Sequence, residues 1–391
     1  MTRLDDVIAA EQERARWAGK AMNVLGQEIT DRFSLYHGDC VEVTRALPTA
    51  SVGYSIFSPP FASLYTYSDS PRDMGNAKDH GEFYEHFAHL VPELLRVTKP
   101  GRLLSFHCMN LPTSKARDGY IGLSDFRGIL IRAFQDAGWI YHSEVVIWKD
   151  PVTAMQRTKA LGLLHKQIKK DSAMSRQGVP DYLVTMRKPG TNPDPVTHTD
   201  DDYPVSLWQR VASPVWMTTR GEDDEGFAVP VGDDDGTDGG TIHPGDTLQK
   251  ESAREDKDER HICPLQLGVI RRALKLWTNP DDVVLSPFAG IGSEGYVALE
   301  MGRRFVGAEL KASYYRQAVR NLQAAQRAAG RQGELFAMTD EQAKDMGKPL
   351  FPDVMPRAYR QAIGRAKALQ EGRFDEEIAQ QAAEDESSPE N

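Results

Sequence analysis

Cysteine is scarce in this chain of 391 residues. The three cysteines, Cys40, Cys108 and Cys263, lie far apart and form no CxxC pair. This spacing argues against a disulfide framework and against a zinc site, and we expect no metal. Unpaired thiols are typical of a reducing compartment, so we expect a cytoplasmic protein.

Long hydrophobic runs are also missing. The sequence contains no stretch of about 18 apolar residues, so we expect no membrane-spanning helix. Its first residues mix acids and bases without an apolar stretch, so we expect no secretory signal. Hydrophobic residues still make up 40% of the chain, which is enough for a sizeable core. The length fits one large domain with insertions or two domains.

Positive charge is in deficit overall, at a net charge of −10, but the two signs are unevenly placed. Residues 194–260 hold 18 acidic and 6 basic residues, so the rest of the chain is slightly basic. Residues 149–188 hold nine basic and three acidic residues. A basic run is most often a solvated surface, but it also suits the phosphates of a nucleic acid.

Apolar periodicity alternates between strands and helices along most of the chain, which is typical of a parallel sheet covered by helices on both faces. Strands are expected at 33–39, 51–57, 102–107, 139–148, 181–187, 282–285 and 304–308. Helices are expected at 1–30, 82–97, 124–137 with Ser124 as N-cap, 265–277, 292–301 and 312–328. Residues 190–260 break the pattern and predict an irregular insertion, and residues 329–391 predict a polar, partly disordered tail.

A glycine-containing turn, SPFAGIGS, runs from Ser286 to Ser293 between an expected strand and an expected helix. Glycines let a ligand approach the backbone, and a helix N-terminus favours negative groups. Glu309 ends the next expected strand, 17 residues after Gly292. A carboxylate there can accept the hydroxyls of a ribose, although an ordinary exposed acid is the plainer interpretation.

Two prolines follow the apolar segment 54–57 in the tetrapeptide Ser58-Pro59-Pro60-Phe61. Because proline lacks an N–H, these residues cannot continue a central strand, and they fix a turn at the edge where α/β proteins bind ligands. Carbonyl groups held outward there are acceptors for an amino group, and Phe61 offers a face on which a base can stack. Taken alone, the motif also fits a plain Pro-Pro loop.

Together these motifs resemble those of the amino-group DNA methyltransferases, which use S-adenosylmethionine to modify N4 of cytosine or N6 of adenine. SPPF corresponds to that family's (Asp/Asn/Ser)-Pro-Pro-(Tyr/Phe/Trp) tetrapeptide, and SPFAGIG to its Asp-Pro-Phe-x-Gly-x-Gly cofactor loop. The lead-in YHGDC and the segment RHICPLQ also match, in the order of the beta class. The resemblance covers roughly residues 33–188 and 243–325. No nuclease motif is evident, which favours a solitary modification enzyme of phage or prophage type over a restriction-modification pair.

The resemblance implies a three-layer, Rossmann-like, S-adenosylmethionine-dependent methyltransferase fold with an irregular insertion. It implies S-adenosylmethionine as cofactor and double-stranded DNA as partner, while the sequence indicates no oligomer and excludes none. The implied regions are an N-terminal helical arm (1–30), a catalytic half (31–148), a DNA-contact and target-recognition region with the acidic insertion (149–260), a cofactor half (261–328) and a polar tail (329–391).

The resemblance also implies roles for single residues. The base donates its amino protons to the Ser58 side chain and the Pro59 carbonyl, Pro60 completes the turn, and Phe61 stacks on the ring. The implied cofactor-binding residues are Asp39, Cys40, His261, Ser286, Phe288, Gly290, Gly292, Ser293 and Glu309. The implied DNA contacts come from the basic residues Arg157, Lys159, Lys166, Lys169, Lys170 and Arg176.

Ser286 departs from the family pattern, which has Asp before Pro-Phe. Glu294 or Asp39 is expected to supply the missing negative charge. The serine that opens the SPPF tetrapeptide leans toward cytosine N4 but leaves adenine N6 open. An RNA amino-group methyltransferase and an inactive DNA-binding relative also remain open, whereas a dehydrogenase is disfavoured because its glycine-rich turn would follow the first strand.

Overall fold

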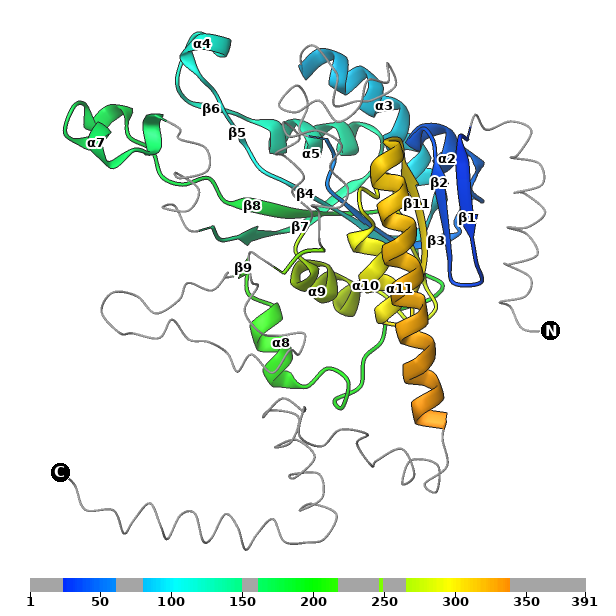
Figure 1. Cartoon of the computed structure of the whole chain (residues 1–391). Coiled ribbons are helices and arrows are strands. Elements are labelled where there is room, and N and C mark those ends of the chain that lie inside the picture. The colour runs from blue at the N-terminus through cyan, green and yellow to red at the C-terminus, as the bar shows by residue number, and fades with distance from the viewer. Residues whose placement is uncertain (1–23, 61–79, 150–160, 217–245, 249–264, 338–391) are drawn as a thin grey trace, which may run out of the picture. The chain divides into compact units, whose positions relative to one another are not determined.

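A computed structural model describes residues 24–60, 80–149, 161–216, 246–248 and 265–337 (Figure 1). The chain divides into two compact units, Met1–Gly330 and Arg331–Asn391. The described part of the first unit contains a nine-stranded sheet with the order β1-β2-β11-β10-β3-β4-β8-β7-β9. None of the described helices has the length and apolar character needed to span a bilayer.

The strands of the large sheet are β1 (Gly26–Ile29), β2 (Phe33–His37), β3 (Val52–Phe57), β4 (Thr98–Cys108), β7 (Ile140–Ile147), β8 (Asp181–Arg187), β9 (Val215–Trp216), β10 (Val283–Ser286) and β11 (Arg304–Glu309). A separate pair is formed by β5 (Leu111–Pro112) and β6 (Leu123–Ser124). The predicted central strands are confirmed, with bounds that differ by a few residues.

Strands β2, β11, β10, β3 and β4 are parallel, as predicted. The prediction of a wholly parallel sheet is wrong at the flanks, because β1 is antiparallel to β2, and β8 is antiparallel to both β4 and β7. Parallel neighbours need a long crossover, usually a helix. The described residues between β7 and β8 hold only short helical turns such as α7 (His165–Ile168), which favours the antiparallel pair.

Side chains from alternating strand positions fill two hydrophobic clusters, one on each face of the sheet. Phe57, Leu104 and Leu285 pack with α2 (Cys40–Ala46), α3 (His80–Val97) and α5 (Phe126–Asp136). Tyr54, Ile56 and Phe305 pack with α9 (Leu267–Trp277), α10 (Ser293–Glu300) and α11 (Ala312–Ala337). The two sets of helices lie on opposite sides of the strands (Figure 1). The predicted three-layer α/β fold is therefore confirmed.

Several local expectations need correction. Asp125, not Ser124, is the N-cap of α5, and its side chain accepts from the Gly128 N–H at 2.9 Å. Ser124 is instead paired with Leu111 in the β5–β6 hairpin, so the helix begins one residue later. Residues 26–29, expected within a helix, form β1.

The described part of the insertion also contains regular structure, namely α8 (Val205–Val211) and β9, which pairs with β7. Trp216 of β9 is buried, and its indole N–H donates to the Val211 carbonyl at 3.1 Å. A buried indole with a satisfied N–H anchors this part of the insertion to the sheet.

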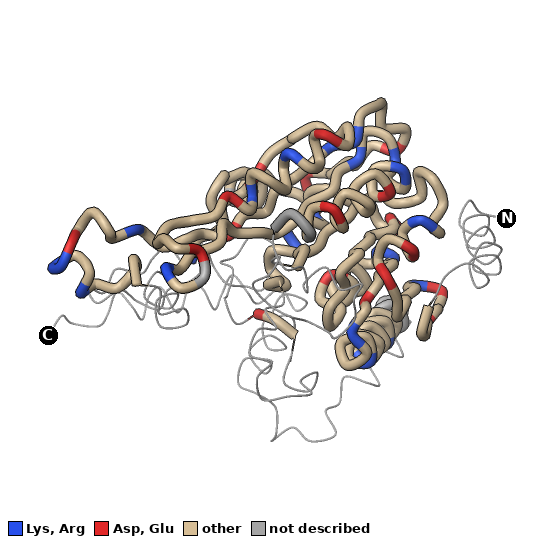
Figure 2. The backbone as a smooth tube through the Cα atoms, turned by 90° about the horizontal axis from the view of Figure 1, so that it is seen from above, with Lys and Arg blue, Asp and Glu red and all other residues tan. Residues whose placement is uncertain are grey.

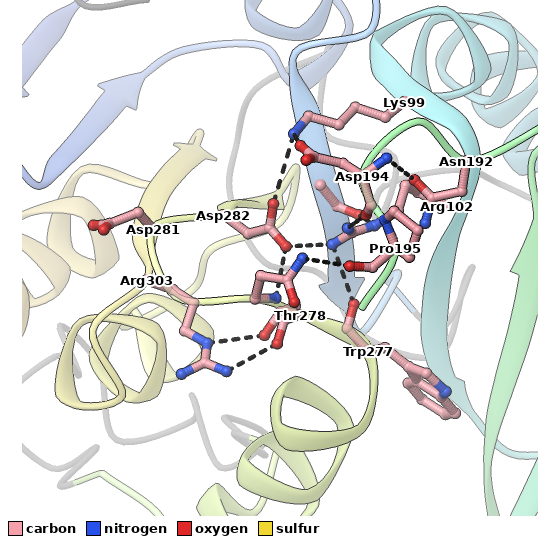
Figure 3. A network of polar contacts seen from close by, with 12 residues as sticks. Lys99, Arg102, Asn192, Asp194, Pro195, Trp277, Thr278, Asp281, Asp282 and Arg303 are labelled. Atoms are coloured by element: carbon pink, nitrogen blue, oxygen red, sulfur yellow. Dashed lines mark hydrogen bonds and ion pairs between the residues drawn. The ribbon is translucent and has the colours of Figure 1, made fainter. Parts of the chain in front are cut away.

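A buried ion pair joins strand β4 to the residue directly before β10 (Figure 3). Arg102 of β4 is 2% exposed and donates to the Asp282 carboxylate, and also to the carbonyls of Gly53 (3.0 Å) and Asp194 (2.9 Å). Lys99 lies 3.7 Å from Asp282 and 3.0 Å from the Asp194 carboxylate. Gly53 is required by this close packing, because a Cβ there would lie 2.7 Å from the Asp282 carboxylate. The network links β3 and β4 with the start of β10.

Replacing Arg102 by alanine is expected to lower the free energy of unfolding by about 3 kcal/mol, because the Asp282 carboxylate then stays buried without its main partner. Urea denaturation measures the loss. Arg132→Ala is the matched control, because its 3.6 Å ion pair with Asp125 is exposed, and it should cost less than about 1 kcal/mol. Equal losses in the two variants would contradict the role given to Arg102.

Candidate active site

The strand order of the sheet reverses between β10 and β3. From β10 the chain passes through α10 to β11 on one side, whereas from β3 it passes through α3 to β4 on the other. The two strands pair in parallel, with Val284 opposite Tyr54 and Leu285 opposite Ser55, so their carboxyl ends reach the same edge. Such a switch point is where open α/β sheets bind ligands.

Both sequence motifs meet at this switch point. Ser58, Pro59 and Pro60 follow β3 directly, and the glycine-containing loop 287–292 follows β10. The rings of Phe57 and Phe288 are in contact, with centroids 5.7 Å apart. The structure therefore brings the two motifs together. Phe61 lies outside the described residues.

Two glycines shape the loop after β10. Gly290 has φ 53° and Gly292 has φ 86°, a backbone region that other residues rarely adopt. A Cβ on Gly290 would meet no atom within 4 Å, so this residue is required for its conformation and not for packing. A Cβ on Gly292 would lie 3.3 Å from Ala318 of α11, so here the helix also packs closely against the loop.

Glu309 ends β11 beside this loop. Its carboxylate accepts from the backbone N–H groups of Gly290 and Lys311, both at 2.8 Å. Its backbone carbonyl accepts from the N–H of Gly38 at 3.0 Å, which holds the Gly38–Cys40 turn at the same edge. Glu309 thus connects the loop after β10 with the turn after β2.

Asp39 and Cys40 lie in that turn. The Asp39 carboxylate caps α2 by accepting from the N–H groups of Val41 and Glu42, at 2.9 and 3.1 Å. The thiol of Cys40 is buried, and burial together with the charge of Asp39 raises its pKa well above the usual value. Cys40 is therefore a neutral thiol at physiological pH.

Three polar side chains around the loop are buried. Ser286 and Ser293 are 0% and 3% exposed, and their hydroxyls have no hydrogen-bond partner within the described residues. Burial raises the pKa of Glu294 to about 8, and the charge of Glu309 adds to this shift. Unsatisfied buried polar groups are unusual in a folded protein and often mark a functional site. Predicted site residue His261 lies outside the described residues.

Ser58 begins a chain of hydrogen bonds that the sequence motifs did not reveal. Its Oγ lies 3.1 Å from Nδ1 of His107, and Nε2 of His107 lies 2.9 Å from Oδ2 of Asp181. Lys149 Nζ is 2.5 Å from the same carboxylate oxygen. Burial raises the pKa of Asp181, but His107 and Lys149 outweigh burial, so the pKa lies below its usual value. The one signal in the sequence was that each of these residues is the first or last residue of an expected strand, or directly follows one.

The basic segment 149–188 divides into internal and surface positions. Lys149 is paired with Asp181, and the Lys188 ammonium donates to the carbonyls of Thr98 (2.7 Å) and Arg96 (3.3 Å). Two of the nine basic side chains thus hold the fold together. They are not free to meet a phosphate.

The surface positions lie around α7, which lies far from α11 in Figure 1. Lys166, Lys169 and Lys170 are exposed, and basic positions gather at the same tip (Figure 2). Arg176 is half-buried and donates to the Gln177 carbonyl at 3.1 Å. Arg157 and Lys159 lie outside the described residues. Within the described part of the chain, no group of three or more His, Cys, Asp and Glu could hold a metal.

The family model for DNA methylases (N6_N4_Mtase) matches residues 54–320. That match covers more than half of the chain. The chain belongs to the DNA methylase family. The matched range includes the SPPF turn, the glycine-containing loop, His107 and Asp181.

Several curated relatives are named as methyltransferases. DNA adenine methyltransferase YhdJ of Escherichia coli K12 is 36% identical over 70 residues, which are 18% of this chain and 24% of that protein. Type II methyltransferase M1.MboII of Moraxella bovis is 40% identical over 58 residues, 15% and 22% of the two chains. Type II methyltransferase M.XycI of Xanthomonas campestris pv. cyanopsidis is 24% identical over 313 residues, 74% and 87% of the two chains. The match to this chain thus spans about a quarter of the length of the first two relatives.

Solved structures share the fold. PvuII DNA methyltransferase (cytosine-N4-specific) matches with a TM-score of 0.51 and 14% identity, over 79% of this chain and 96% of that one. TTHA0409 of Thermus thermophilus, solved with S-adenosyl-L-methionine, matches with a TM-score of 0.51 and 20% identity, over 75% and 93%. These similarities confirm the predicted Rossmann-like methyltransferase fold.

Glu294 is expected to make stability depend on pH. Its folded pKa of about 8 lies above the unfolded value of about 4.3, so between these values the folded protein holds a proton that the unfolded chain has released. The resulting stabilisation is complete below the unfolded pKa and is lost as the pH rises through the folded pKa. Between about pH 5 and pH 8, the wild type should lose up to about 1.4 kcal/mol per pH unit relative to Glu294→Gln in urea denaturation. Parallel pH curves would contradict this assignment.

Proposed function

We propose that this protein is an S-adenosylmethionine-dependent DNA methyltransferase that modifies an exocyclic amino group of a base rotated out of the duplex. The observation that carries the proposal is the meeting of the Ser58–Pro60 turn and the loop 287–292 at the switch point of the sheet. Membership of the DNA methylase family supports DNA as the substrate. The target is N4 of cytosine or N6 of adenine, and the names of the relatives include both kinds of base.

The residues around the loop fit S-adenosylmethionine. The uncrowded Gly290 lets a ligand approach the backbone. The hydroxyls of Ser286 and Ser293 have no hydrogen-bond partner among the described residues, so they have hydrogen-bonding capacity left. Glu309 would accept ribose hydroxyls, because each of its oxygens has a second lone pair. The bound cofactor supplies an electrophilic methyl group on a sulfonium. Asp39, Cys40, His261, Phe288 and Gly292 complete the proposed cofactor set. Of the two acids expected to supply the negative charge that the family places at position 286, Asp39 fits better than Glu294, because a pKa of about 8 leaves Glu294 mostly protonated at neutral pH.

The Ser58–Pro60 turn is rich in acceptors and poor in donors. Pro59 and Pro60 have no N–H, so their peptide groups offer only carbonyl oxygens. An exocyclic amino group is a donor, and the Ser58 hydroxyl and the Pro59 carbonyl would accept its two protons. Catalysis then rests on positioning and electrostatics, without a covalent enzyme intermediate. Stacking of the base on Phe61 is part of the same proposal.

The double variant Ser58→Ala/Pro59→Ala is expected to lower methyl transfer to DNA by about 10²-fold or more. It removes the Ser58 hydroxyl, and it removes the proline ring that fixes the turn presenting the Pro59 carbonyl, so the amino nitrogen is no longer held in line with the methyl group. Its affinity for S-adenosylmethionine, measured by isothermal titration, should stay within a few-fold of the wild type. Long-read sequencing of host DNA, with and without expression of the wild type, reports the modified base and its context.

The double variant Ser51→Ala/Pro48→Ala is the matched control, because its Ser51 hydroxyl donates to the Pro48 carbonyl just before β3, at the opposite edge of the sheet. The control should retain methyl transfer. Full activity in the Ser58/Pro59 variant would overturn the assignment. Methylation of RNA in place of DNA would favour an RNA methyltransferase, and a wild type that binds no S-adenosylmethionine would favour an inactive relative.

The exposed lysines around α7 are proposed to contact DNA phosphates, together with Arg157, Lys159 and Arg176. The triple variant Lys166→Ala/Lys169→Ala/Lys170→Ala should weaken duplex binding and reduce the slope of log K against log salt by about 0.9 for each phosphate that is no longer neutralised. The triple variant Arg316→Ala/Arg320→Ala/Arg327→Ala, which removes the same charge from exposed positions on α11, is the control. A slope that responds equally to both triple variants, or to neither, would contradict the proposal.

A further inference from the structure

We infer that His107 and Asp181 are positioning residues that set the direction of the Ser58 hydroxyl and receive, through it, the proton that the methylated nitrogen releases. The inference rests on the proposed function for its substrate, a base with an exocyclic amino group. The contacts from Ser58 to His107, from His107 to Asp181 and from Asp181 to Lys149 do not depend on that substrate.

The chain of contacts crosses four neighbouring strands at one edge of the sheet. Ser58 follows β3, His107 is the penultimate residue of β4, Asp181 opens β8, and Lys149 follows β7. Strand β8 runs antiparallel to β4 and β7, so its first residue lies where the other three strands end. The sheet itself therefore aligns the four side chains.

The direction of each hydrogen bond follows from Asp181. This carboxylate only accepts when it is ionised, and Lys149 beside it keeps it ionised. Nε2 of His107 must then carry the proton that it donates, which leaves Nδ1 of the neutral ring as an acceptor. Ser58 donates its hydroxyl proton to Nδ1, so the lone pairs of Oγ remain available to a donor. An amino group of a base is such a donor.

The arrangement differs from that of a serine hydrolase. In a hydrolase triad, Nε2 faces the serine and Nδ1 faces the aspartate. Here the two ring nitrogens are exchanged. The residue after the serine also lacks the N–H that an oxyanion hole needs, because Pro59 follows Ser58. Ser58, His107 and Asp181 are thus arranged to accept a proton from a substrate donor, not to attack a carbonyl carbon.

The proton balance of methyl transfer matches this chain. The nitrogen lone pair forms the new N–C bond, while the electrons of the C–S bond stay on sulfur, which becomes a neutral thioether. The nitrogen then carries a positive charge and must lose one proton. Ser58 Oγ accepts it while passing its own proton to Nδ1 of His107. The positive charge ends on an imidazolium that the Asp181 carboxylate stabilises, and the proton leaves later to solvent.

Cys108, next to His107, interacts electrostatically with Arg127 and Glu144. Arg127 of α5 is paired with Glu144 of β7 at 2.8 Å. Cys108, next to His107, is buried, and burial raises the pKa of its thiol well above the usual value, so it is neutral. Asp181 and Lys149 are the charged side chains that the chain of contacts itself contains.

The first test is the tautomer of His107, read from imidazole ¹⁵N shifts of the wild type without any ligand. We expect a proton on Nε2 and a bare Nδ1. In Asp181→Asn, the new amide can donate to Nε2, so the proton should move to Nδ1 and the Ser58 hydroxyl should turn outward. A wild-type ring that is protonated on Nδ1 would overturn the inference without reference to activity.

The second test is the rate of methyl transfer to DNA. Asp181→Asn and His107→Asn should each lower kcat by about 10²-fold or more, with KM for DNA and affinity for S-adenosylmethionine within a few-fold of the wild type. A selective loss of kcat, with KM and cofactor affinity kept, separates a positioning role from a merely structural one.

Two exposed pairs elsewhere provide matched controls. His142→Asn alters a histidine whose Nδ1 lies 2.9 Å from Ser143 Oγ, and Asp202→Asn alters an aspartate 3.2 Å from His198. Both should leave kcat and the KM for DNA unchanged. An active wild type whose His107→Asn variant keeps the same kcat would overturn this inference and leave the proposed function intact. A wild type that methylates no nucleic acid would overturn the proposed function, while the tautomer measurement would still decide the direction of the Ser58 hydroxyl.

Discussion

Parallel hydrogen bonding between β10 and β3 is the constraint on which the site depends. The strands come from distant parts of the chain, and their register decides that the Ser58 turn and the glycine-containing loop end at one edge. A slip of one residue would turn the buried side chains of either strand to the wrong face of the sheet. The Arg102–Asp282 pair lies at the amino ends of these strands (Figure 3), so the register is held from the opposite edge.

Several unsatisfied polar groups lie where this constraint places the site. The hydroxyls of Ser286 and Ser293 and Oδ1 of Asp181 are buried without hydrogen-bond partners within the described residues. Glu294 is buried close enough to Glu309 for their charges to interact. Elsewhere the two faces of the sheet are covered by apolar clusters. Proteins tolerate such local departures mainly at functional sites, where a ligand supplies the missing partners.

Basic side chains have two different roles in this chain. Lys149, Lys188 and Arg102 are used internally, against a carboxylate or backbone carbonyls. The lysines around α7 are exposed and stay available to a partner. Net charge alone hides this division, because long-range attraction of a polyanion depends on where the exposed charge lies.

The sequence by itself determined the central strands, both motifs and the three-layer class, because apolar periodicity, glycine turns and a Pro-Pro break are local signals. It also indicated strands that begin at Asp181 and end near His107, but not their directions. Tertiary structure decided that β8 is antiparallel, and this alone brings Asp181 to His107 and Ser58. The N-cap at Asp125 was likewise decided by the pairing of Ser124 with Leu111. Strand direction and pairing depend on hydrogen bonds between distant segments, which no local pattern encodes.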